Sequence, residues 1–124
     1  MRKRSKLVSV IDDDESVREA LPDLLRSFGL SVEAFPSAEA FLESQALEAS
    51  DGIILDVAMP GMTGPELQRE LRRRNLRVPI IFVTAFADEM ARARLLSDGA
   101  AGCLFKPFSD EELQSALRLA SLVT

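Results

Sequence analysis

Short apolar runs alternate with amphipathic segments along the whole chain, and this alternation limits the possible folds more than any other feature. Five runs have the length and apolar character of β-strands, at 7–11, 31–35, 52–56, 79–84 and 101–105. Each is followed by a segment with helical features, and these begin near residues 14, 38, 65, 88 and 110. The third and fourth runs are apolar on both faces, as in parallel strands covered by helices on both sides. We therefore predict an α/β fold of (βα)5 order with a doubly wound, five-stranded parallel sheet in three layers.

Local signals place several helix ends. Ser37 and Ser109 suit the N-cap position, and Pro65 suits the first residue of a helix. Pro22 lies inside the first predicted helix, so we expect either a kink there or a later helix start.

Composition excludes several classes of protein. A hydrophobic fraction of 47% is enough for a folded core, and 124 residues suit one domain, predicted to span 1–124. The net charge of −5 gives no general attraction for nucleic acid, so we expect no direct binding of it. Basic residues gather only locally, in Arg2–Lys6 and in Arg69, Arg72, Arg73, Arg74 and Arg77, which we interpret as a solvated tail and a solvated helix face.

Features of membrane and secreted proteins are also missing from the sequence. The single cysteine, Cys103, cannot form an internal disulfide. No apolar run approaches the roughly 20 residues of a membrane-spanning helix, and the apolar stretch near the N-terminus is too short for a signal peptide. We expect a cytoplasmic location with no membrane attachment.

Polar side chains stand where the predicted strands end. They are Asp12, Asp13 and Asp14 after the first strand, Asp56 at the end of the third, Thr84 at the end of the fourth and Lys106 after the fifth. The carboxyl ends of parallel strands form one edge of the sheet, where such folds place their functional crevice. Two carboxylates about 4 Å apart repel by roughly 4 kcal/mol at an effective dielectric near 20, so either one is protonated or a hard cation lies among them. Oxygen ligands favour Mg²⁺, and a chain with no His and one Cys is a poor candidate for zinc.

Each of these residues also has an ordinary structural interpretation. Asp14 is expected to cap the first helix, whereas Asp12 and Asp13 are expected to be metal ligands. A cis Lys106–Pro107 bond would aim the lysine side chain over the same edge.

At these positions the sequence resembles the receiver domain of two-component response regulators, the CheY-like family. The matching segments are 10–14 (Val-Ile-Asp-Asp-Asp), 55–64 (Leu-Asp-Val-Ala-Met-Pro-Gly-Met-Thr-Gly), Thr84-Ala85, Gly99-Ala100 and Lys106-Pro107-Phe108. Each segment is weak alone, but together and in this order they are specific, and the resemblance covers essentially the whole chain. Residues 37–42 further resemble the FixJ-type branch.

The resemblance implies a function and a role for each residue. Asp56 would be the phosphoacceptor, Asp13 would bind Mg²⁺ directly, and Asp12 would bind it mainly through water. The backbone carbonyl of Ala58 would be a further ligand, while Thr84 and Lys106 would contact the phosphoryl oxygens and the small Ala85 would leave room for the phosphate. A histidine kinase or phosphotransfer protein would supply the phosphoryl group, so the chain would be no enzyme in the usual sense.

Phosphorylation would then switch a surface formed by the helix near 88–97, the strand 101–105 and the last helix, with a possible linked homodimer. The output, absent from this chain, would be control of transcription through a further domain.

Two departures from the family pattern affect this switch. The family usually places Tyr or Phe three residues before the lysine, but Cys103 stands there and is expected to be a small buried side chain. Ala58 and Phe86, which flank the path of the attacking water, are both apolar, so we predict slow loss of the phosphoryl group.

Three alternatives stay open. A Mg²⁺-dependent phosphohydrolase resembling haloacid dehalogenases needs a second Asp two residues after the nucleophile, where this chain has Ala58. A flavodoxin would need a phosphate loop rich in Ser, Thr and Gly in place of three acids. A pseudo-receiver would keep the fold as a docking module without the chemistry.

Overall fold

One parallel sheet forms the centre of the computed structural model, which describes residues 5–124. Its strand order is β2-β1-β3-β4-β5, and every neighbouring pair is parallel. The strands are β1 (Leu7–Ile11), β2 (Ser31–Phe35), β3 (Gly52–Asp56), β4 (Ile80–Thr84) and β5 (Gly102–Phe105). The predicted doubly wound sheet is therefore confirmed, with strand ends that differ from the predicted ones by one residue at most.

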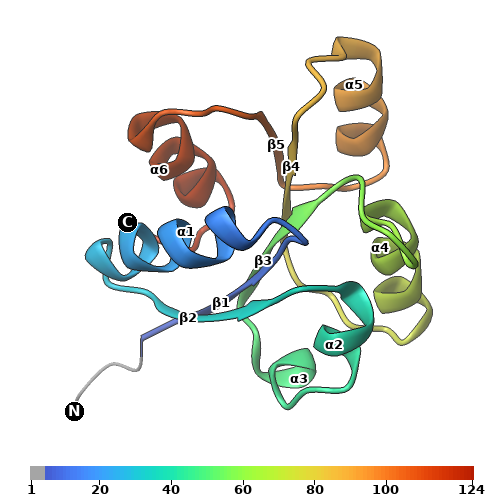
Figure 1. Ribbon diagram of the computed structural model, residues 1–124, viewed down its shortest axis with the longest axis horizontal. Helices are drawn as coiled ribbons and strands as arrows, with labels where there is room; N and C mark the ends of the chain where they lie inside the picture. The colour runs from blue at the N-terminus through green and yellow to red at the C-terminus, as the bar shows by residue number, and fades with distance from the viewer. Residues whose placement is uncertain (1–4) are drawn as a thin grey trace.

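Helices cover both faces of this sheet. They are α1 (Glu15–Ser27), α2 (Ala38–Leu42), α3 (Ala46–Ala49), α4 (Gly64–Arg73), α5 (Glu89–Ser97) and α6 (Asp110–Leu119). Figure 1 shows α1 and α6 on one face and α2 to α5 on the other, which gives the three predicted layers. The one-turn helix α3 was not predicted from the sequence. Most of the basic Arg2–Lys6 segment lies outside the described residues.

Two apolar cores hold the layers together. Val10 and Ile54 point to the face under α1 and α6, where Leu25 and Leu117 cover them. The opposite side chains of the same strands, such as Leu55, are buried under α2 to α5. Because β3 and β4 are buried on both faces, their near-continuous apolar sequence follows directly from their central place in the sheet.

Side-chain caps fix the helix starts. Ser37 accepts a hydrogen bond from the backbone N–H of Ala40, and Ser109 forms a capping box with Glu112, so both predicted N-caps are confirmed. Pro22 is buried within a helix that already begins at Glu15, so the expectation of a later helix start is wrong. A proline is tolerated here although it removes one helical hydrogen bond, because its ring packs into the interior beside Leu21.

Candidate functional site

Strand register brings the polar strand ends together. Ile11 of β1 lies beside Leu55 of β3, so the next residues, Asp12 and Asp56, emerge side by side. Thr84 lies beside Phe105 in the pair of β4 and β5, so Lys106 follows at the same edge. The register thus produces the convergence that the sequence predicted for parallel strands.

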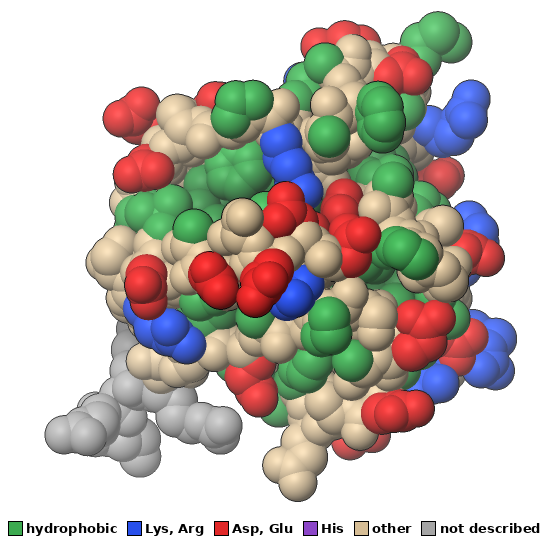
Figure 2. Space-filling model, in the orientation of Figure 1, with side chains coloured by type: hydrophobic (Ala, Val, Ile, Leu, Met, Phe, Trp, Pro, Cys, Tyr) green, Lys and Arg blue, Asp and Glu red, His purple; other side chains and the backbone are tan. Residues whose placement is uncertain are grey.

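Three carboxylates form a compact group at this edge. One oxygen each from Asp12, Asp13 and Asp56 lies within 4.8 Å of the others, which is a spacing that one metal ion can bridge. Asp12 is fully buried, Asp56 is 7% exposed, and Asp13 faces solvent. Figure 2 shows acidic side chains gathered across the middle of this face, with basic side chains among them.

Lys106 is the cation nearest to this group. Its Nζ donates a hydrogen bond of 2.9 Å to Oδ2 of Asp12 and lies 3.8 Å from Oδ2 of Asp56. The Lys106–Pro107 bond is cis, as the sequence suggested. Burial lowers the pKa of Lys106, but the hydrogen bond and the charge of Asp12 outweigh this effect and raise that pKa above its ordinary value.

Asp56 is buried, and its contact with Lys106 is longer than that of Asp12. Burial, followed by repulsion from Asp12, raises the pKa of Asp56 from 3.8 to about 7 against the opposing attraction of Lys106. Three carboxyl groups share the single ammonium group of Lys106, which is closest to Asp12. The group as a whole therefore keeps an excess of negative charge. Oxygen ligands, uncompensated charge and short spacing together fit a small divalent cation such as Mg²⁺.

Other predicted residues lie near the edge with different contacts. Thr84 is buried at the end of β4, and its hydroxyl accepts a hydrogen bond of 3.1 Å from the backbone N–H of Phe86. Ala58 is exposed in the loop after β3. Asp14 lies outside the carboxylate group and caps α1 by accepting from the N–H of Ser16, as predicted. The roles of Thr84 and Ala58 remain predictions.

The sequence did not reveal the supporting roles of two residues. Arg18 on α1 donates a hydrogen bond of 3.0 Å to the backbone carbonyl of Asp12 and so fixes the turn that carries the acids. Gly64, the first residue of α4, packs against the backbone carbonyl of Asp56, where an added Cβ would collide with it. Gly64 was named only as the last residue of the matching segment 55–64, without this packing role, and no local signal identified Arg18.

The chain is similar to proteins of one known family. Residues 8–118 match the family described as "Response regulator receiver domain". The chain belongs to this family. This receiver domain is 42% identical to the response regulator protein TodT of Pseudomonas putida F1, and the match covers 97% of the receiver domain. It is 41% identical to the transcriptional regulatory protein FixJ of Azorhizobium caulinodans over 90% of its length. The chain spans about half the length of these relatives, 53% in each case.

Solved structures agree with this assignment. The response regulator StyR superposes with a TM-score of 0.84 at 42% identity, covering 94% of this receiver domain and 59% of the StyR chain. The structure described as FixJ-N superposes with a TM-score of 0.82 at 32% identity, covering 96% of this chain and 95% of that one. The resemblance to CheY-like receivers and their fold is thereby confirmed.

Position 103, where the family usually has Tyr or Phe, is occupied by a cysteine in this chain. Cys103 is buried in the core, as predicted, and burial raises the pKa of its thiol. Beside it, the guanidinium carbon of Arg92 lies 3.8 Å from the centre of the Phe105 ring.

The helices of residues 5–124 include none that is long and apolar enough to cross a membrane.

Proposed function

We propose that this receiver domain is phosphorylated on Asp56 in a Mg²⁺-dependent reaction, with a histidine kinase or phosphotransfer protein as donor. One observation carries the proposal: the carboxylates of Asp12, Asp13 and Asp56 share one site with the ammonium group of Lys106. Uncompensated buried acids lower the stability of a fold. A pseudo-receiver that only docks partners would have no use for them, so they favour a phosphorylated receiver.

The chemistry assigns a task to each side chain. A carboxylate oxygen of Asp56 attacks phosphorus, the P–N bond of a phosphohistidine breaks, and the donor imidazole leaves with its electron pair. Lys106 lies close enough to Asp56 to hold a phosphoryl oxygen, so we assign it charge stabilisation. The hydroxyl of Thr84 at the same edge would donate to another phosphoryl oxygen.

The same residues suit the metal. Asp13 and Asp56 would hold Mg²⁺ directly and Asp12 mainly through water, with the Ala58 carbonyl as a further ligand. When bound, Mg²⁺ would offset the negative charge of the acids and of the incoming phosphoryl group.

Incubation with acetyl phosphate and Mg²⁺, followed by intact mass, tests this proposal directly. We expect one added phosphoryl group on the wild type and none on Asp56→Asn. Replacement of Asp23, an exposed acid on α1, by Asn serves as the matched control and should leave the added mass unchanged. Phosphorylation of Asp56→Asn at the wild-type rate would exclude Asp56 as the acceptor.

An apolar groove beside the acceptor suits the phosphoryl donor. It has a volume of about 400 Å³ between α1 and the loop that follows β5, and its lining includes Val17, Ala20, Lys106 and Phe108. Figure 2 shows apolar side chains filling the area between α1 and α6. A helix of the donor seated there would place its phosphohistidine near Lys106 and Asp56.

A charged residue in this groove should separate donor binding from chemistry. Ala20 is exposed, so Ala20→Glu should fold normally, accept phosphate from acetyl phosphate at the wild-type rate, and lose transfer from a phosphorylated histidine donor by about tenfold or more. Ala93→Glu on α5 is the control because it is exposed on a helix remote from the groove. Equal loss in both variants would contradict donor docking on α1.

On the output side, we propose that phosphorylation favours a homodimer through α5, β5 and α6 and so controls transcription through a further domain. Strongly exposed apolar side chains lie on or beside these elements: Phe86 just before α5, Met90 in its first turn and Leu119 at the end of α6. Beryllofluoride, a phosphoryl analogue, should shift the wild type toward a dimer in sedimentation velocity, and Met90→Glu should stay monomeric. A wild type that remains monomeric with the analogue bound would refute this part.

A further inference from the structure

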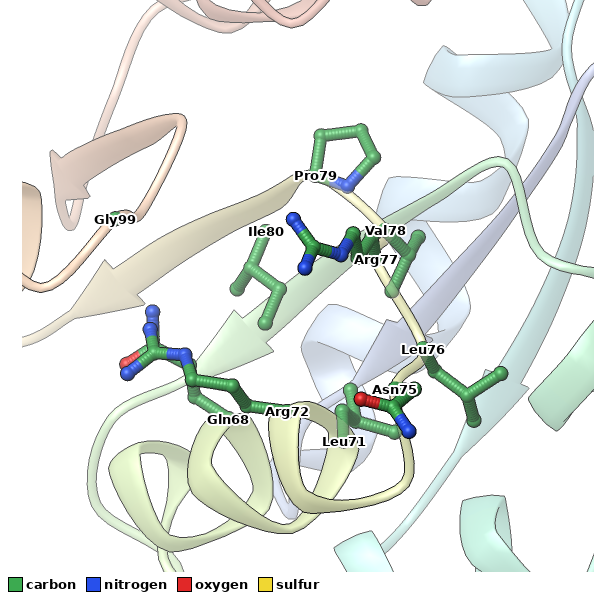
Figure 3. A pocket seen from close by; sticks show the side chains of 10 residues that line it. All are labelled: Gln68, Leu71, Arg72, Asn75, Leu76, Arg77, Val78, Pro79, Ile80 and Gly99. Atoms are coloured by element: carbon green, nitrogen blue, oxygen red, sulfur yellow. The ribbon is translucent and has the colours of Figure 1, made fainter.

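A second hollow lies at the opposite edge of the sheet from the acceptor. It has a volume of about 500 Å³ and lies between the end of α4, the segment 75–80 that leads into β4, and Gly99 after α5. Its walls are apolar, with Ile80 and Leu76 among them, whereas Gln68, Arg72, Asn75 and Arg77 supply its polar groups. Figure 3 shows the guanidinium groups of Arg72 and Arg77 on either side of Ile80.

Gln68 is the unusual member of this set. Its residue is only 7% exposed, and within residues 5–124 its carboxamide has no hydrogen-bond partner, but the amide atoms stay open to solvent through the hollow. The carboxamide therefore offers the hollow one donor group and one acceptor that no described residue occupies.

Neighbouring arginines divide into two groups. Arg73 and Arg74 both pair with Glu70, at 2.6 Å each, and are thereby compensated. Arg72 and Arg77 line the hollow instead, and its lining includes no acidic side chain from residues 5–124. Arg72 donates to the backbone carbonyl of Asp98, while Arg77 has no ion pair with any described residue. The hollow is thus a cationic site in a chain of net charge −5.

We propose that this hollow binds a small organic anion, a carboxylate or phosphate monoester carried on a flat apolar body. Guanidinium groups and carboxamides are the donors that recognise such anions. The apolar walls would take the body of the ligand, and the volume lies within the range of small-molecule sites. The site uses neither Asp56 nor the metal-binding acids, so it is independent of the proposed phosphorylation.

Titration of the ¹⁵N-labelled chain, followed by NMR, tests the proposal. The probes are 2-naphthoate and phenyl phosphate, and the neutral 2-naphthalenemethanol is the control. We expect saturable shifts of the Gln68 side-chain amide and of the Gly99 backbone amide with an anion, and binding of the alcohol weaker by about tenfold or more. Shifts with 2-naphthoate alone or with phenyl phosphate alone would identify the preferred anion, and either supports the site.

Matched variants show whether the anion binds in the hollow itself. Arg77→Gln should weaken anion binding by about tenfold, whereas Arg69→Gln, an exposed arginine of α4 that does not line the hollow, should leave it unchanged. Asp56→Asn should also bind normally, even if the phosphorylation proposal fails. The absence of saturable shifts, equal binding of the neutral alcohol, equal weakening by Arg69→Gln, or shifts confined to the acceptor edge would each overturn the proposal.

Discussion

Replacing Asp56 by Asn should stabilise this protein, and the gain should depend on pH. In the unfolded chain Asp56 titrates near 3.8, whereas in the folded protein burial and the neighbouring Asp12 raise its pKa to about 7. Well below pH 3.8 the carboxyl is protonated in both states and does not affect stability. As the pH rises toward 7, the unfolded chain loses a proton that the folded protein retains, so stability falls, and the full penalty applies above about pH 7.

The size of the effect follows from the same two values. A difference of about three pH units corresponds to about 4 kcal/mol at 25 °C. Because Asp13 leaves one side of the group open to solvent, water and side-chain movement will relieve part of the repulsion, so we expect about 2 kcal/mol. For a domain of 124 residues this is a rise in Tm of about 5–10 °C for Asp56→Asn at pH 8 without metal.

Urea unfolding of wild type and Asp56→Asn at pH 4.5 and pH 8, without divalent ions, measures this difference. The gain should be large at pH 8 and small at pH 4.5, and Asp23→Asn should show no gain at either pH. At pH 8, Mg²⁺ should stabilise the wild type more than Asp56→Asn because it relieves the same repulsion. A gain that is equal at both pH values, or a loss at pH 8, would refute the proposed cause.

Three further predictions follow from contacts at the site. Lys106→Met should destabilise the protein by about 3 kcal/mol in urea unfolding, because it leaves the buried Asp12 without its ion pair; an unchanged midpoint would contradict this. Ala58→Asn should shorten the phosphoryl lifetime, measured as loss of added mass, because a polar side chain can orient water near the acceptor; a wild-type lifetime of seconds would refute slow self-dephosphorylation. Gly64→Ala should lower the melting temperature and the rate of phosphorylation by acetyl phosphate, because its Cβ would displace the Asp56 carbonyl, and a wild-type rate would show that the loop can adjust freely.

Much of the fold could be predicted because the local signals agreed with the tertiary structure. Each strand was marked by an apolar run, and Ser37 and Ser109 marked helix starts through their own hydrogen bonds. The one-turn helix α3 could not be predicted, since four residues are too few to show helical periodicity. Pro22 misled the prediction because a local penalty was weighed without the burial that offsets it.

The sequence alone determined which polar residues stand at the strand ends, and parallel pairing then required them to share one edge. It could not determine how their charges are distributed. Only the tertiary structure pairs Lys106 with Asp12, 94 residues away, and leaves Asp56 poorly compensated. It alone also separates the arginines that pair with Glu70 from Arg72 and Arg77 around the second hollow. Spacing along a chain fixes the local conformation, whereas charge compensation depends on which distant side chains approach within a few ångströms.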